Sequence, residues 1–308
     1  MNHTANAMRD TQLLLERYFQ DLVPISAQAT PVLKHSYSEL SRITLAGKHI
    51  RSRLVHIAAG RVKGSQYDAA VAFGAAVNLL HGAFLVHDDF IDADCTRRGE
   101  MSFHNSLGQV AQDVHIGDSL AVLAGDMAIA GAIDLACHEL VPVELQAPAV
   151  RILVDAMTES IHGELSDVAH RVPQSTHTLN DVRLSNHMKT SAYTFRAPLM
   201  LGALAAGRDL SVMVPIANSF GFAFQAADDV TGHQGDIEKQ RVTMVTARLN
   251  SEGDSDLAAV LKAVAAEARA ALEDACDLAQ SLELPSDVKE GLMGIAALMD
   301  ENLHKLGV

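Results

Sequence analysis

The chain contains no tryptophan, and aromatic residues make up only 4% of its 308 positions. Strands favour aromatic and β-branched side chains, so this scarcity disfavours a β-sandwich. Hydrophobic residues nevertheless reach 48%, with abundant Ala, Leu and Val, which is enough for a large core of closely packed helices. The sequence therefore predicts an all-α protein. No repeat, low-complexity segment or Pro/Ser-rich linker interrupts it, so we expect one domain over residues 1–308.

Cysteine and basic residues are also scarce. The three cysteines, Cys95, Cys137 and Cys276, are odd in number and widely spaced, which indicates reduced thiols and excludes a disulfide framework or a zinc site. Lys and Arg number 24 against 38 Asp and Glu, giving a net charge of −14. An acidic balance argues against a nucleic-acid partner and predicts a soluble, cytoplasmic protein.

Long uninterrupted apolar runs are absent as well. The polar segment at residues 1–12 acquires a carboxylate at once, with no apolar stretch of the kind a secretion signal requires. The longest apolar run, residues 69–86, approaches the length of a membrane span but contains Asn78 and His81. We therefore expect a buried central helix and no membrane-spanning segment.

Helical periodicity covers most of the chain. Pro24 is expected to end the first helix, and Pro142 and Pro148 are expected to bracket a connection. The predicted helices cover residues 9–22, 31–40, 46–62 after a Gly-led turn, 67–92, 115–140, 149–169, 215–231, 255–282 and 285–305, with a further helical stretch near residues 186–207.

The most informative stretch, LLHGAFLVHDDFIDADCTRRG at residues 79–99, ends an apolar helix in a burst of charge. On a helix, Asp88 and Asp92 lie one turn apart and project from one face. Two nearby carboxylates suit Mg²⁺, which usually takes one or two carboxylates together with phosphate oxygens. Arg97 and Arg98 follow closely, and guanidinium groups match phosphate oxygens bidentately. The alternative is a solvated acidic helix end followed by a basic loop.

A second cluster of the same kind weakens that alternative. FQAADDVTGHQGD, residues 224–236, again ends an apolar helical run on paired aspartates, of which Asp228 is the first. With both clusters, the chain resembles the trans-isoprenyl (polyprenyl) diphosphate synthases over roughly residues 40–250. The resemblance implies an all-α, isoprenoid-synthase-type helical bundle around a central cavity. It also implies two or three Mg²⁺ ions per site, held by Asp88, Asp92 and Asp228.

The resemblance extends to the predicted diphosphate-binding residues. The segment GKHIR resembles the family's GGK-x-x-R-P, so Lys48 and Arg51 are implied to bind isopentenyl diphosphate, with Ser52 in place of proline. An ordinary basic helix start is the alternative for this segment. His81, which could equally be a satisfied core histidine, and Arg98 are implied to complete that pocket. Arg97 is implied to neutralise the allylic diphosphate.

Further family positions follow. Lys189 and Thr190 interrupt a helical pattern that otherwise belongs in the core; since a buried lysine is costly without a partner, an anion is expected there. The family's KT pair implies that this anion is the allylic diphosphate, with Gln225 nearby. The segment GELSD, residues 163–167, resembles GQ-x-x-D with Glu164 replacing glutamine. Two departures are larger: Gly232 replaces the last aspartate of the second motif, and the loop after Asp236 is shortened, with Arg241 at the position of a family lysine.

The resemblance implies a short-chain trans-prenyl diphosphate synthase, an enzyme that condenses isopentenyl diphosphate with an allylic diphosphate. The cavity-floor positions are Ala83 and Phe84, and one aromatic next to a small residue favours a C20 product, geranylgeranyl diphosphate, with C15 and C25 open. The family is usually homodimeric. A degenerate paralogue acting as a regulatory subunit, a prenyltransferase to another acceptor, a class I terpene cyclase and a non-enzymatic helical scaffold are the alternatives. Two predicted diphosphate pockets disfavour the cyclase.

Overall fold

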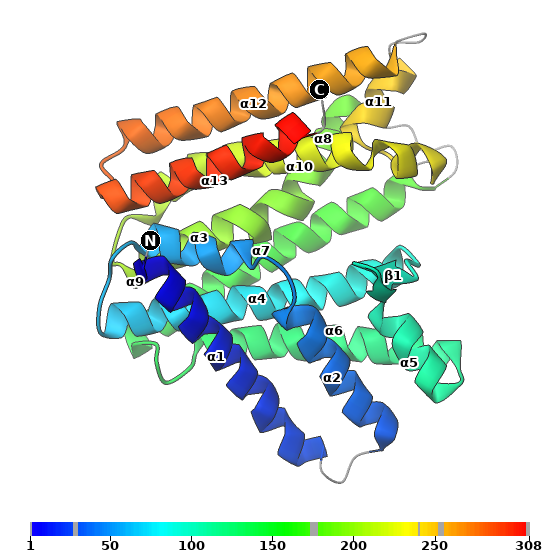
Figure 1. Ribbon diagram of the computed structural model, residues 1–308, viewed down its shortest axis with the longest axis vertical. Helices are drawn as coiled ribbons and strands as arrows, with labels where there is room; N and C mark the ends of the chain where they lie inside the picture. The colour runs from blue at the N-terminus through cyan, green and yellow to red at the C-terminus, as the bar shows by residue number, and fades with distance from the viewer. Residues whose placement is uncertain (1, 27–29, 173–177, 240, 252–255, 306–308) are drawn as a thin grey trace. The chain divides into compact units, whose positions relative to one another are not determined.

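The computed structural model describes residues 2–26, 30–172, 178–239, 241–251 and 256–305, and nearly all of them are helical (Figure 1). The α-helices are α1 Asn2–Ser26, α2 Pro31–Leu45, α3 Ile50–Ala59, α4 Ser65–Ile91, α5 Phe103–Ala111, α6 Val114–Ala136, α7 Val143–His170, α8 Leu179–Asn186, α9 Ala197–Ala205, α10 Met213–Glu238, α11 Met244–Ser251, α12 Leu257–Ser281 and α13 Ser286–Lys305. A π-helix, η1 His187–Arg196, a 3₁₀ turn, η2 Leu210–Val212, and a hairpin of β1 Thr96–Arg97 and β2 Glu100–Met101 complete the described elements. The prediction of an all-α fold is confirmed.

The chain forms two compact units. Unit 1 comprises Met1–His56 and Val62–Val150, and unit 2 comprises Ile57–Arg61 and Arg151–Val308. The single domain and the central cavity expected from the sequence stay predictions.

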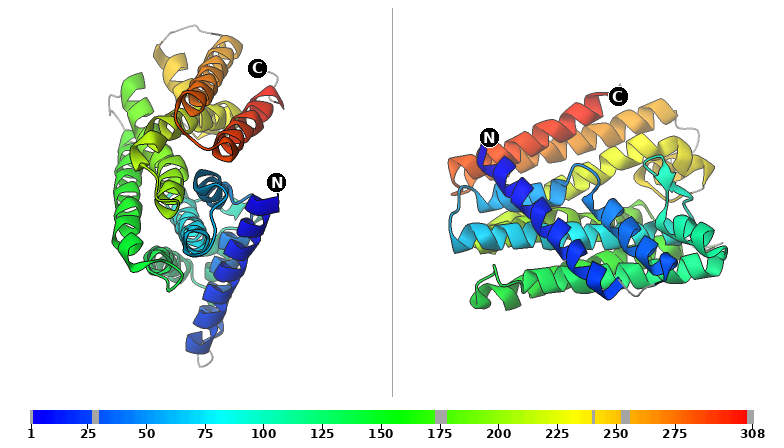
Figure 2. Two further views of the ribbon diagram at one scale, coloured as in Figure 1. Left: turned by 90° about the vertical axis from the view of Figure 1, so that its left-hand side faces the viewer. Right: turned by 60° about the horizontal axis from the view of Figure 1, so that its bottom comes forward.

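Unit 1 is built around α4. This helix lies beside α6 and also contacts α1, α2 and α5 (Figure 1), and α1 crosses it obliquely (Figure 2). Its most apolar window is 89% buried within the structure, as expected for a central helix that is apolar on every side. The largest fully buried side chains here include Phe73, Leu79, Leu80 and Phe103. Because α4 is held on several sides, the acidic residues at its C-terminal end have a rigid support.

Unit 2 is built around α10 in the same way. This helix packs against α12, α13, α9, α11 and η1, and Figure 1 shows α12 and α13 running along it. Phe195 of η1 stacks near Phe220 and Phe224 of α10, with ring centroids 5.9 Å and 5.6 Å apart. Aromatic pairs at such separations add to the burial of their apolar area. The core therefore fixes η1, which carries Lys189, against the helix that carries the second acidic motif.

Several predicted helix boundaries are wrong. Helix α1 continues past Pro24 to Ser26, and α7 begins at Val143 with Pro148 inside it, where a connection was expected. A proline inside a helix removes one backbone hydrogen bond. The buried side chains of Ala149 and Leu153, on the following turns of α7, offset that loss through packing. The hairpin, α5, α8 and α11 were not predicted, and the helical stretch expected near residues 186–207 begins as a π-helix, η1.

Three helical segments are long and apolar enough to cross a membrane by length and composition: Ser65–Ile91, Val114–Ala136 and Leu210–Glu238. Their most apolar windows are 89%, 44% and 39% buried within the structure, respectively. The burial of the first agrees with the predicted central helix. For the other two segments, the expectation that they do not span a membrane stays a prediction.

Candidate functional site

The carboxylates of the first acidic motif differ in burial and in their contacts. Asp88 and Asp92 stand one turn apart at the C-terminal end of α4, both half-buried, and the Asp92 N–H donates to the Asp88 carbonyl at 2.8 Å. Asp89, between them, is only 1% exposed and receives the Arg97 guanidinium, with N–O distances of 2.6–2.8 Å. Asp89 thus anchors an arginine, while Asp88 and Asp92 are more exposed than Asp89.

The arginine pair lies on the β1–β2 hairpin. Thr96 pairs with Met101 and Arg97 with Glu100, so Arg98 and Gly99 form a two-residue turn in which both residues have positive φ, 54° and 83°. This pair of left-handed residues is typical of a type I′ hairpin turn. The Arg98 side chain reaches back to Gly47, where an added Cβ would lie 2.8 Å from Nη1. The absence of a side chain at Gly47 therefore allows the guanidinium to approach the loop before Lys48.

Four of the predicted basic residues converge in unit 1. Burial lowers the pKa of His81 well below its usual range, and the positive charges of Arg51, Arg97 and Arg98, in that order, lower it further. His81 is therefore neutral at physiological pH, and its surroundings are strongly positive. Lys48 is exposed in the loop before α3, and Arg51 stands in the first turn of that helix, where the helix N-terminus also favours anions. The cluster is suited to a diphosphate.

Ser52, the departure from the family's proline, has a structural role. Its side chain is fully buried and its hydroxyl donates to the Gly74 carbonyl of α4 at 2.7 Å. This bond fixes the start of α3 on α4. The substitution of serine at this position is thus accommodated by a hydrogen bond that proline cannot make.

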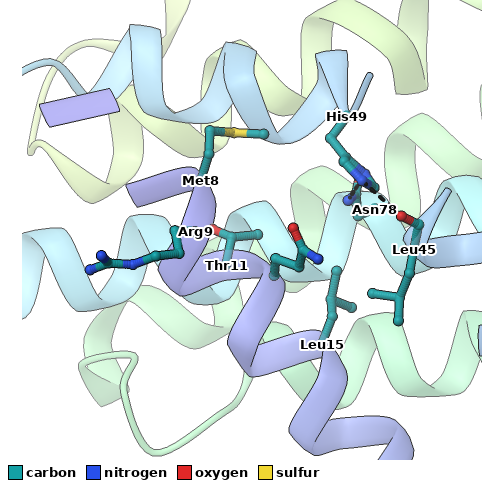
Figure 3. Close-up of a pocket in the computed structure, with 8 residues that line it drawn as sticks. Met8, Arg9, Thr11, Leu15, Leu45, His49 and Asn78 are labelled. Atoms are coloured by element: carbon teal, nitrogen blue, oxygen red, sulfur yellow. Dashed lines mark hydrogen bonds between the residues drawn. The ribbon is translucent and has the colours of Figure 1, made fainter. Parts of the chain in front are cut away.

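His49 was not singled out from the sequence. It adopts a left-handed φ of 47°, and its ring lies 2.6 Å from the Asn78 amide and 3.1 Å from the Leu45 carbonyl. This ring lines a cavity of about 230 Å³ (Figure 3). Its lining residues are Met8, Arg9, Thr11, Gln12, Leu15, Leu45, His49 and Asn78. The loop that carries Lys48 is therefore braced by a polar contact to α4.

The predicted cavity-floor residues lie one turn before the acidic motif on α4. Ala83 is fully buried within the structure, whereas Phe84 is half-buried. Their part in setting product length stays a prediction.

In unit 2, Lys189 already has anionic partners. Its ammonium nitrogen lies 2.7 Å from Glu164 Oε2 and 3.4 Å from Asp167 Oδ2, both in the GELSD segment of α7. An added Cβ at Gly163 would overlap the Lys189 backbone, so this glycine allows α7 and η1 to approach closely. The sequence predicted an anionic partner for Lys189, but not these two carboxylates.

Lys189 and Thr190 lie on η1, a ten-residue π-helix. Such helices are rare, usually span one turn and frequently occur at functional sites. The Thr190 hydroxyl donates to the Gln225 amide oxygen at 2.5 Å, and the Gln225 amide nitrogen donates to Asp229 Oδ1 at 2.7 Å. Two residues predicted from the sequence are therefore joined in one hydrogen-bonded chain that ends on the second motif.

Asp229 is the buried member of the second motif. It is 2% exposed and also accepts hydrogen bonds from the Met244 N–H at 2.8 Å and the Asn186 amide at 3.3 Å. Burial raises its pKa to about 7, although the bonds from Met244 and Gln225 oppose the rise. Asp228, in contrast, is exposed. As in the first motif, one aspartate is buried and hydrogen-bonded, and its neighbour is more exposed.

The last turn of α10 carries Asp236 next to Gly232. Burial raises the pKa of Asp236; Arg241 lowers it, Asp228 raises it, and Lys239 and Asp167 act more weakly in opposite directions. The Arg241 N–H donates to the Asp236 carbonyl at 2.8 Å. Asp228 and Asp236, two turns apart on α10, thus interact electrostatically, and the basic residues Arg241 and Lys239 act on Asp236 as well.

The donor chemistry fits Mg²⁺. In the described residues, no three His, Cys, Asp or Glu side chains are grouped so as to hold a metal by themselves. Asp88 with Asp92, one turn apart on α4, offers hard carboxylate oxygens as a pair, and Asp228 offers a further exposed carboxylate on α10. Mg²⁺ keeps waters and takes one or two carboxylates together with substrate phosphates, so such pairs are sufficient when a diphosphate supplies the other ligands.

Comparisons with known proteins agree with this geometry. The family model described as "Polyprenyl synthetase" matches residues 33–246. The chain is 30% identical over 295 residues to a geranylgeranyl diphosphate synthase of Mycobacterium tuberculosis, covering 86% of this chain and 81% of that protein. It is 31% identical over 202 residues to a geranylgeranyl diphosphate synthase of Sulfolobus acidocaldarius, covering 63% of this chain and 56% of that protein.

Solved structures show the same fold. A geranylgeranyl pyrophosphate synthase from Corynebacterium glutamicum, complexed with isoprenyl diphosphate and magnesium, superimposes with a TM-score of 0.83 at 22% identity. The match covers 95% of this chain and 97% of that one. The predicted isoprenoid-synthase-type helical fold is therefore confirmed.

Proposed function

The chain belongs to the polyprenyl synthetase family, and we propose that it is a short-chain trans-prenyl diphosphate synthase. In this reaction the C–O bond of an allylic diphosphate breaks, the double bond of isopentenyl diphosphate attacks the resulting carbocation, and a proton leaves. The observation that carries the proposal is the position of the Arg98 guanidinium against Gly47, on the hairpin that buried Asp89 anchors through Arg97. We expect this basic cluster to bind a diphosphate close to the intact Asp88–Asp92 pair.

We assign the residues as follows. Asp88, Asp92 and Asp228 would hold Mg²⁺, and the bound metal would supply positive charge to a departing diphosphate. Two or three ions per site are expected. Lys189 and Arg241 neutralise oxygens of the allylic diphosphate. In support, Thr190, which follows Lys189, is joined through Gln225 to Asp229 of the second motif, and the Arg241 N–H donates to the Asp236 carbonyl.

The co-substrate pocket consists of Lys48, Arg51, His81 and Arg98. A neutral His81 donates a hydrogen bond without adding charge, and the guanidinium groups bind oxygens bidentately. Arg97 is assigned to the allylic diphosphate, as the sequence predicts. Its bond to buried Asp89 also holds the hairpin and thereby positions Arg98.

Thr190 and Gln225 orient the site through their hydrogen-bonded chain to Asp229. We propose a C20 product, geranylgeranyl diphosphate, because the small side chain of Ala83 leaves room for the growing chain beside Phe84. In further support, the two relatives reported above are named geranylgeranyl diphosphate synthases.

The proposed assembly is a homodimer formed through α6. The side chains of Ile116 and Leu123 are 43% and 63% exposed, and Leu120, Met127 and Ala130 continue the same stripe at helical spacing. An apolar stripe with this period is suited to packing against a second helix. Sedimentation velocity of the wild type and of Leu123→Asp tests it: a dimer that becomes a monomer supports the proposal, and a wild-type monomer contradicts it. A cytoplasmic location stays a prediction.

A two-substrate assay tests the function against its main alternatives. A synthase releases pyrophosphate only when both an allylic diphosphate and isopentenyl diphosphate are present with Mg²⁺. A terpene cyclase needs the allylic substrate alone, and a regulatory subunit releases none by itself. Release that requires both substrates supports the proposal, and either of the other patterns contradicts it.

A further inference from the structure

The loop before α3 contains two residues with left-handed backbone, one on each side of Lys48. Gly47 has a φ of 108° and His49 a φ of 47°. Glycine adopts this region readily, but a residue with a Cβ stays there only where its surroundings hold it. The contacts of the His49 side chain must therefore stabilise the backbone of this loop.

His49 joins three helices of unit 1. Its Nε2 lies 3.1 Å from the Leu45 carbonyl at the end of α2, and its Nδ1 lies 2.6 Å from Nδ2 of Asn78 on α4. Its backbone carbonyl accepts a hydrogen bond from the Arg53 N–H, in the first turn of α3, at 3.0 Å. His49 thus fixes the start of α3 against both α2 and α4.

The two ring contacts define which nitrogen of His49 carries the proton. A carbonyl oxygen only accepts hydrogen bonds, so Nε2 donates to Leu45. Nδ1 then has a lone pair and accepts from the Asn78 amide, which requires a neutral ring. Asn78 is only 4% exposed, so loss of the ring would leave its amide without this partner and with little access to water.

Hydrogen bonding matters more here because one side of the contact is not packed. His49 and Asn78 both line the cavity of about 230 Å³ (Figure 3). Atoms that border a cavity lose dispersion contacts on that side. The orientation of the His49 ring therefore depends on its two hydrogen bonds more than on packing.

His49 also lies close to the predicted isopentenyl diphosphate pocket. Burial and three arginines lower the pKa of His81, and His49 is the next contributor. In sequence it stands directly after Lys48 and two residues before Arg51. A change in its backbone would therefore move these two basic residues relative to each other.

We propose that His49 is a positioning residue for isopentenyl diphosphate. Its neutral ring, held by Asn78, keeps the loop in the conformation in which Lys48 and Arg51 bind the substrate together. The inference rests on the proposed function and goes beyond it, because it gives a role to two residues that bind no substrate themselves. Without the contact the loop adopts other conformations, and the affinity falls with the fraction of molecules that remain competent.

The test is a double-mutant cycle on binding. Isothermal titration calorimetry with isopentenyl diphosphate compares the wild type with His49→Ala, Asn78→Ala and the double variant. Each single variant should bind about five-fold more weakly, the effect of one lost hydrogen bond. The double variant should bind no more weakly than the single variants, because both remove the same contact. The C10 allylic diphosphate, titrated with Mg²⁺, should bind all four proteins within about two-fold, because other residues are assigned to it.

His49→Gly separates the ring from the backbone. Glycine adopts the left-handed φ without strain but has no side chain to meet Asn78. If the ring positions the loop, His49→Gly should weaken binding of isopentenyl diphosphate at least as much as His49→Ala does.

Thr11→Val is the matched control. Thr11 lines the same cavity, and its hydroxyl lies 2.8 Å from Nε2 of His56, in a later turn of α3 away from the loop. Loss of this buried hydrogen bond should lower the temperature of unfolding and leave the affinity for isopentenyl diphosphate within about two-fold of the wild type. Circular dichroism establishes that each variant is folded.

Four results overturn the inference: unchanged affinity for isopentenyl diphosphate in His49→Ala, wild-type affinity in His49→Gly, equal weakening for both substrates, or losses that multiply in the double variant. A folded wild type that does not bind isopentenyl diphosphate overturns both the inference and the proposed function. A wild type that binds it but fails the two-substrate assay contradicts the proposed function alone, and the cycle still decides the role of His49.

Discussion

The ammonium nitrogen of Lys189 lies 2.7 Å from Oε2 of Glu164, a residue that stands where the family pattern has a neutral glutamine. Asp167 lies 3.4 Å from the same nitrogen. Lys189 is therefore held by one more negative charge than the pattern provides. A diphosphate that binds Lys189 must compete with that charge.

Glu164→Gln should consequently strengthen binding of the allylic substrate. Replacing the carboxylate by an amide keeps the shape of the side chain and removes the negative charge that competes with the diphosphate for Lys189. Because partly exposed ion pairs are weak, we expect the KM of the allylic diphosphate to fall roughly two- to five-fold. The measurement is KM for the allylic diphosphate at saturating isopentenyl diphosphate, with KM for the latter as the internal control. A rise in the allylic KM would show that Glu164 assists binding instead.

Asp89→Asn should destabilise the protein through Arg97. Asp89 is 1% exposed and Arg97 is 28% exposed, so the change leaves a largely buried guanidinium without its charged partner. We expect a loss of roughly 2 kcal/mol in the free energy of unfolding, below the value for a fully buried pair because Arg97 keeps some solvent contact. Urea unfolding measures it.

Asp155→Asn provides the control for this experiment. Its pair with Arg151 has side chains that are 75% and 55% exposed, so the same chemical change should cost less than about 0.5 kcal/mol. Equal losses in the two variants would contradict the structural role assigned to Asp89.

Phe84→Ala should lengthen the product. The substitution removes the aromatic floor residue one turn before Asp88, and a deeper cavity admits further additions of the five-carbon unit. Product analysis by chain length is expected to show a shift beyond C20. Leu85→Ala, the adjacent but more deeply buried position, should lower stability without changing product length. An unchanged distribution for Phe84→Ala would remove this residue from the floor.

Protonation of His56 should lower the free energy of unfolding in mild acid. Its side chain is 3% exposed, its Nε2 lies 2.8 Å from Thr11 Oγ1, and burial lowers its pKa to about 4 from 6.5. The folded state thus excludes a proton that the unfolded state binds. The contribution of His56 to the free energy of unfolding is therefore complete above pH 6.5 and is lost as the pH falls toward 4. The expected loss is about 2 kcal/mol between about pH 7 and pH 5. Urea unfolding of the wild type and His56→Gln measures it, and an equal pH dependence in both would contradict the assignment.

Helical periodicity and charge clusters allowed much of this structure to be predicted. The helices that carry the two acidic motifs follow from apolar runs that end on paired aspartates, and Lys189 required a partner because its surroundings are apolar. These features are local in sequence. The family identity, in turn, is carried by the spacing of the motifs.

The features that were missed depend on contacts between distant residues. Helix α11 begins where the Met244 N–H meets Asp229, and Pro148 is accepted inside α7 because the turns around it are packed. The different roles of Asp88 and Asp89 also depend on tertiary contacts. The helix face shared with Asp92 separates Asp88 from Asp89 in the sequence, but only the hairpin that carries Arg97 shows what Asp89 binds.

The central claim is tested most directly by incubating the protein with Mg²⁺, labelled isopentenyl diphosphate and each of the C5, C10 and C15 allylic diphosphates, and measuring product chain length. The account predicts a C20 product that is lost in Asp88→Ala. A folded wild-type protein that incorporates no label with any starter would contradict it.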